Sequence, residues 1–170
     1  MEPLRELLAT DHRQTLEFFF VELRELSEPG VDRDELLYNA SVLAHFAQTS
    51  TTSSVDFPSP SHLGEIFDHF VFDDALHDDE EAMESAGAQC LLLAGFFEEQ
   101  MRRRHNIRWY AGLGAGFFRR AAERSSSAKK ARVLGLMSVD FEAWRQRHAR
   151  LGRELHDRPY LLPFSSRLAG

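Results

Sequence analysis

Apolar residues recur three and four positions apart along nearly the whole chain, which is the spacing of one face of a helix. The most regular run lies near the C-terminal end, at Leu134, Met137, Phe141, Trp144, His148, Leu151 and Leu155. Side chains at this spacing form a stripe that a helix buries against its neighbours. Almost no segment alternates as a strand would. The sequence therefore predicts an all-α fold, a single helical domain over residues 1–170 built as a bundle of about six helices.

Residues that cap or interrupt helices determine the expected helix bounds. Ser and Thr occupy eight of the thirteen positions 49–61, and two more are Pro, so a flexible loop is expected there. Pro159 ends the last helix and leaves a tail at 158–170 with several apolar residues. The second helix begins at Asp32 or Asp34, either of which can cap it. The expected helices cover residues 3–26, 32–50, 62–72, 79–104, 107–124 and 128–156.

Charge is divided unevenly along the chain. Residues 1–100 hold 4 Lys and Arg against 22 Asp and Glu, whereas residues 101–170 hold 16 against 5. Part of this split is helix electrostatics, because the expected helix 79–104 starts with acids and ends with arginines, which suits its dipole. Pairs such as Glu98 with Arg102 add to this within the helix. The remainder predicts that acidic helices of the first part face basic helices of the second.

Several classes of function lack their sequence motifs. The single cysteine, Cys90, allows no intramolecular disulfide and no thiolate zinc site. The chain contains no GxxxxGK[ST], GxSxG or HExxH stretch. Its longest apolar run, at residues 86–97, is well short of the roughly 20 residues that span a membrane. The N-terminal sequence lacks a basic and then apolar leader, so a cytoplasmic location and no membrane partner are expected.

One series of acids and histidines has metal-ligand spacing. Glu65 is followed at steps of four by His69, Asp73, His77 and Glu81. On one continuous helix, neighbouring members would lie one turn apart and could share a divalent ion. The alternative is a solvated polar face opposite the apolar residues of the same helix. We favour the solvated face and predict no cofactor, with a divalent metal at His69, Asp73, His77 and Glu81 as the alternative.

Two histidines, His12 and His148, lie within apolar stripes. Such histidines are usually hydrogen-bonded packing residues, although the two could form a ligand site if they met. The glycines of residues 111–118 predict a tight crossing against residues 86–97. Four polar or amphipathic residues are the ones expected around any pocket: Gln89, Arg103, Trp109 and Tyr110.

Residues 102–110 interleave arginines with aromatics, a mixture that suits phosphate contacts and base stacking. The alternative is that Trp109 and Tyr110 anchor a corner between helices while the arginines pair with the acidic half. The whole chain has a net charge of −7, which repels a polyanion. Nucleic-acid binding is therefore the least favoured interpretation.

A longer pattern covers about 30 residues of this region. Its members are Gly87, Gln89, Leu91, Gly95, Phe96, Phe97, Arg103, Arg104, Trp109, Tyr110, Leu113 and Gly114. The pattern resembles one found in uncharacterised bacterial all-helical proteins. The resemblance implies a bacterial source and a helical fold, and it implies no catalytic residue.

The sequence therefore favours a non-enzymatic cytoplasmic helical protein that acts through protein–protein contacts, in a regulatory or accessory role. The partner is another protein or a second copy, with a homodimer preferred because the apolar tail needs a groove to cover it. A metal- or small-ligand-binding bundle, as an enzyme or sensor, is the first alternative. Nucleic-acid binding through the basic C-terminal half is the second.

Overall fold

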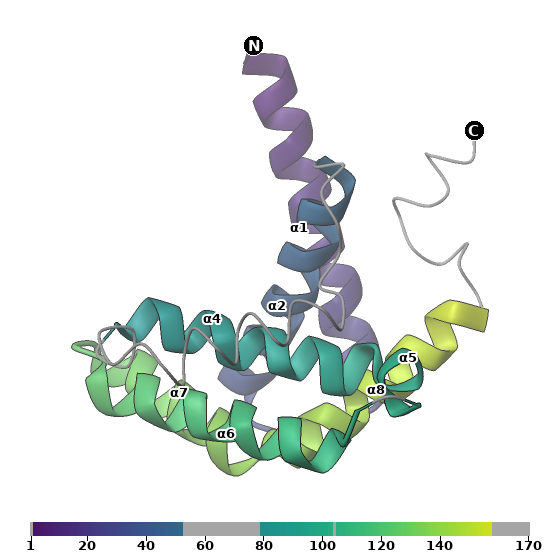
Figure 1. Ribbon diagram of the computed structural model, residues 1–170. Helices are drawn as coiled ribbons and strands as arrows, with labels where there is room; N and C mark the ends of the chain where they lie inside the picture. Colours follow the sequence, from purple (N-terminus) through teal and green to yellow (C-terminus); the bar gives the residue numbers. More distant parts are fainter. Residues whose placement is uncertain (1, 53–78, 104, 158–170) are drawn as a thin grey trace. The chain divides into compact units, whose positions relative to one another are not determined.

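A computed structural model describes residues 2–52, 79–103 and 105–157 (Figure 1). The side chains described are those of residues 13–47, 79–103 and 105–155. Every regular element in these ranges is helical and none is a strand, so the predicted all-α fold is confirmed. The chain forms two compact units, residues 1–57 with 153–170, and residues 58–152. The single domain expected from the sequence stays a prediction.

The first unit is built on a helical hairpin. Helix α1 (Glu2–Glu25) and helix α2 (Arg33–Thr52) pack side by side (Figure 1). The chain turns at Pro29 and Gly30, and α2 starts where an Asp32 carboxylate oxygen accepts a hydrogen bond from the Glu35 amide at 3.0 Å. The buried apolar residues of the two helices are Phe19, Leu23, Leu36, Ala40, Leu43 and Ala44. Because α2 continues to Thr52, the predicted loop is wrong for residues 49–52, and its remainder lies outside the described residues.

The second unit begins with a helix that changes its winding. Helix α4 (Glu80–Leu91) is capped by Asp79 and continues into a π-helical turn, η2 (Leu92–Phe96). Helix α5 (Glu98–Arg102) follows. The Phe97 amide donates to the Leu92 carbonyl five residues back at 2.9 Å, which is the π pattern. The expected uninterrupted helix 79–104 is therefore wrong, because the chain widens around Gly95.

Helix α6 (Ile107–Arg124) has the bounds predicted from the sequence. The expected single helix 128–156 is instead two, α7 (Ala128–Val139) and α8 (Phe141–Asp157), which meet at Asp140. The Ser138 hydroxyl donates to the Ala115 carbonyl at 2.8 Å and ties the end of α7 to α6. The apolar residues continue at steps of three and four through this turn. Met137, Phe141 and Trp144 are all buried on the two sides of it.

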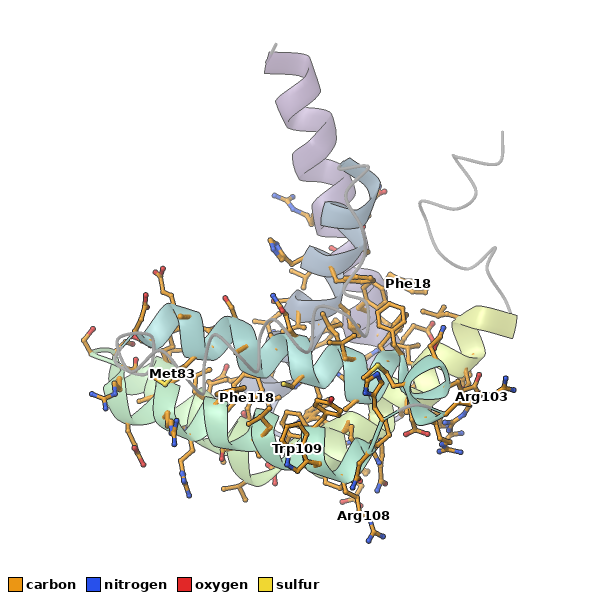
Figure 2. All side chains as sticks on the ribbon, in the orientation of Figure 1. Phe18, Met83, Arg103, Arg108, Trp109 and Phe118 are labelled. Carbon is orange, nitrogen blue, oxygen red and sulfur yellow. The ribbon has the colours of Figure 1, made fainter. Side chains whose placement is uncertain are left out.

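Small residues allow α4 and α6 to pack closely. A Cβ on Gly114 would lie 2.6 Å from the Phe141 ring and 2.8 Å from the Cys90 Cβ. The predicted tight crossing is thus confirmed at Gly114. Figure 2 shows Phe118 between α4 and α6, where its ring covers Gly87.

Gly95 packs elsewhere, since a Cβ there would lie 2.9 Å from the Cβ of His148 on α8. A Cβ on Gly152, further along α8, would be 2.3 Å from the Phe96 carbonyl oxygen. These two glycines therefore bring α8 and η2 close enough for backbone contact.

The expected helix at 62–72 and the tail at 158–170 lie outside the described residues. None of the described helices is long and apolar enough to cross a membrane.

Candidate functional site

A cluster of charged side chains with a buried ion pair at its centre lies where η2 meets α8. The side chains of Glu98 and Arg145 are 7% and 11% exposed. Arg145 Nη1 donates to Glu98 Oε2 at 2.5 Å and to the Ala94 carbonyl at 3.1 Å, and its Nη2 donates to Glu142 Oε1 at 2.6 Å. Glu98 also pairs with Arg102, as the sequence predicted. One guanidinium therefore joins η2, α5 and α8.

The charged forms of this cluster stabilise one another. The hydrogen bond from Arg145 lowers the pKa of Glu142 below its ordinary value. The bonds to Glu142 and Glu98 raise the pKa of Arg145, against the opposing effect of burial. Both groups thus stay ionised at neutral pH, and the cluster holds the π turn in place rather than exchanging protons.

Two other titratable groups in this unit are buried and neutral. Burial and the nearby Arg147 lower the pKa of His148 to about 3, so its imidazole is uncharged at neutral pH. Burial raises the pKa of the Cys90 thiol to about 12. A thiol of this kind is a packing group and a poor nucleophile at neutral pH.

We therefore expect Cys90 to resist a maleimide or iodoacetamide reagent in the native protein. Its modification should proceed only as fast as the second unit opens, because the side chain is fully buried. Mass spectrometry of the native and urea-unfolded protein measures both rates, and the single cysteine makes the signal unambiguous. Equal rates in the two states would contradict the buried position.

An aromatic corner, defined as His105, Trp109 and Tyr110, lies at the start of α6, with His105 just before the helix. The Asn106 side chain caps the helix by accepting a hydrogen bond from the Trp109 amide at 3.3 Å. Tyr110 packs against Leu93 and Met101, and its hydroxyl lies 3.3 Å from His105 Nδ1. The Trp109 ring stands edge-on to Tyr110, with centroids 4.8 Å apart, and is 46% exposed.

The structure brings together two of the four residues predicted around a pocket, Trp109 and Tyr110. Gln89 is half-buried on α4, and Arg103 is exposed at the end of α5. Neither has a side-chain hydrogen bond or ion pair to Trp109 or Tyr110 in the described part of the chain. Figure 2 shows Arg108 extending outward from the start of α6, beside Trp109.

The other predicted ligands are only partly described. His148 is buried in the second unit, but the side chain of His12 lies outside the described residues, so their meeting stays a prediction. His69, Asp73 and His77 also lie outside, whereas Glu81 is exposed in the first turn of α4. Among the described residues, no three His, Cys, Asp or Glu side chains are grouped to hold a metal.

Ion pairs link the acidic and basic parts of the second unit. Lys130 of α7 lies 2.9 Å from Glu84 and 3.8 Å from Glu80 on α4, and the hydrogen bond to Glu84 raises its pKa. Together with Arg145 and Glu98, this confirms at two places the pairing that the charge split predicted.

Sequence reasoning missed the Glu98–Arg145–Glu142 cluster. Two signals pointed to it: an acid directly after the apolar run 86–97, and a Glu–Arg pair three residues apart on α8. Which acid an arginine on another helix would meet depends on how the helices cross, and spacing along the chain does not determine that.

Comparison with known proteins gives no relative. No protein-family model, no curated protein and no solved structure matches the chain. The resemblance to bacterial helical proteins therefore stays a prediction.

Proposed function

We propose that the protein is a non-enzymatic, cytoplasmic, bacterial helical protein that acts through protein–protein contacts and forms a homodimer. The observation that carries this proposal is the exposed Trp109. Trp, Tyr and Arg dominate the energetic centres of protein interfaces. Here an exposed Trp stands on a Tyr and is next in sequence to the exposed Arg108.

The support beneath Trp109 suits an interface anchor. Its backbone is fixed by the Asn106 cap, and its ring rests on Tyr110, which is itself packed on the core. An anchor held in place before binding loses little conformational freedom when a partner covers it.

Two glycines on the helix surface beyond Trp109 have no described neighbour from another element. Gly112 and Gly116 follow at steps of three and four on α6, and a Cβ added to either would meet no described atom within 4 Å apart from the backbone of α6 itself. Glycine inside a helix costs about 1 kcal/mol relative to alanine. The packing of the described residues gives no reason for these two glycines, whereas a partner helix approaching beside Trp109 would.

Trp109→Ala tests the proposal. Loss of a central aromatic anchor typically costs at least about 2 kcal/mol, so the dimer dissociation constant should rise about 30-fold. Sedimentation equilibrium of the full chain over a concentration series measures this constant. Val139→Ala is the matched control, because Val139 is 81% exposed on α7 and should leave the constant unchanged.

Tryptophan fluorescence gives an independent signal. The chain has two tryptophans, and Trp144 is fully buried. The quenching of fluorescence by acrylamide therefore reports on Trp109. Quenching should fall as the protein is concentrated into its dimer. A wild-type chain that stays monomeric at high concentration, or a variant that dimerises as tightly, would refute the homodimer.

The two alternatives have their own tests. Iron, zinc or manganese at one equivalent or more in protein purified without added metal would favour the metal site at His69, Asp73, His77 and Glu81. A gel shift at low salt, where phosphate contacts are strongest, would favour nucleic-acid binding.

A further inference from the structure

The turn of the first unit forms a cleft that the proposed function does not use. Its volume is about 570 Å³, which lies within the usual size of small-ligand sites. Eight residues of the α1–α2 turn line it: Phe20, Arg24, Ser27, Glu28, Pro29, Val31, Arg33 and Leu36. All of them belong to one unit, so the α1–α2 hairpin alone shapes the site.

The charges of this cleft run against those of its surroundings. Residues 1–100 contain only 4 basic residues, and two of them, Arg24 and Arg33, line the cleft. Glu28 is the one acid among the lining residues, so the lining carries a net positive charge. The sequence around the cleft is strongly acidic, so the positive charge that can attract an anion is confined to these two guanidinium groups.

Both arginines are available to a ligand. Each is exposed, and neither forms an ion pair with a described residue, although Glu28 lines the same cleft. The Arg24 guanidinium lies 5.9 Å from the centroid of the Phe20 ring, and this contact leaves its donors unused. An arginine presents a planar set of N–H donors that matches a carboxylate or phosphate.

The remaining lining is apolar. Leu36 is buried, while Phe20 and Val31 are half-buried and Pro29 adds its ring. A surface of this kind favours a hydrocarbon or aromatic body over water. We infer that this cleft binds a small amphiphilic anion, whose acidic group meets Arg24 and Arg33 and whose apolar body covers Phe20, Val31 and Leu36.

Decanoate is a suitable probe, because it joins a carboxylate to an unbranched hydrocarbon chain. Titration of the full ¹⁵N-labelled chain, followed by amide shifts, locates and measures binding in one experiment. We expect saturable shifts centred on residues 20–36. Decanol, which has the chain without the charge, and acetate, which has the charge without the chain, should each bind at least tenfold more weakly.

Variants separate the two arginines from general surface charge. Arg24→Gln and Arg33→Gln should each weaken decanoate binding about 3- to 10-fold, and the double variant more. Arg13→Gln is the control, since Arg13 is an exposed base of α1 that does not line the cleft. Raising the salt concentration should also weaken decanoate binding and leave decanol unaffected.

Three outcomes would overturn the inference. They are shifts that centre outside residues 20–36, decanol binding as tightly as decanoate, and unchanged affinity in the double variant. A replacement of decanoate by decyl phosphate distinguishes a carboxylate from a phosphate as the preferred acid. None of these results depends on Trp109 or on dimer formation.

Discussion

Arg145→Met is expected to lower the free energy of unfolding by about 3–5 kcal/mol, the usual cost of removing one partner from a buried ion pair. Arg145 holds Glu98, Glu142 and the Ala94 carbonyl at once. Without it, the Glu98 carboxylate, whose side chain is 7% exposed, loses its bond to the buried guanidinium and keeps its pair with the exposed Arg102. A buried charge with too few partners is among the most costly defects in a protein interior.

Urea denaturation at pH 7 measures the change. Arg119→Met is the matched control, because Arg119 is exposed on α6 and its loss should change stability by no more than about 0.5 kcal/mol. Equal effects of the two substitutions would contradict the role of the cluster.

A second substitution separates the ion pair from simple packing. In Arg145→Met with Glu98→Leu, the buried carboxylate is removed together with its partner, so the double variant should be more stable than Arg145→Met alone. If the losses of unfolding free energy in Arg145→Met and Glu98→Leu simply added in the double variant, Arg145 would act through its hydrocarbon stem and not through Glu98.

The helices were predictable because the residues that start and stop them act locally. The bounds of α6 follow from Asn106 at its start and the serines after Arg124, all within one turn of the helix ends. The break at Asp140 was not predictable in this way. Apolar spacing continues through it, and the hydrogen bond from Ser138 to Ala115 that accompanies it joins residues 23 positions apart.

The same limit applies to the candidate sites. Trp109 and Tyr110 were found because they are adjacent in sequence, and Glu98 with Arg102 because they are one turn apart. The bond between Arg145 and Glu98 spans 47 positions and depends on Gly95 and Gly152, which let α8 approach η2. The cleft at the α1–α2 turn could likewise not be predicted without the hairpin, because the spacing of Arg24 and Arg33 along the chain does not indicate that both line one cleft.

His148 makes the stability of the protein depend on pH in a defined window. Its pKa is about 3 in the folded chain and 6.5 when exposed, because burial disfavours the charged imidazolium. Well above pH 6.5 the imidazole is neutral in both states, so the folded state keeps its full stability. As the pH falls below 6.5, the unfolded chain binds a proton that the folded chain rejects, so stability falls.

The expected loss is about 1.4 kcal/mol for each pH unit, or about 2 kcal/mol by pH 5. Urea denaturation between pH 7.5 and 5 measures it in a range that stays above the lowered pKa of Glu142. His148→Leu should abolish this component, because leucine fills the same buried space without a titrating group. A variant with the same pH slope as the wild type would show that His148 becomes protonated in the folded state, which requires either a local opening of α8 or an anion beside the ring. The pH slope thus tests whether the close packing of Gly95 against His148 persists in solution.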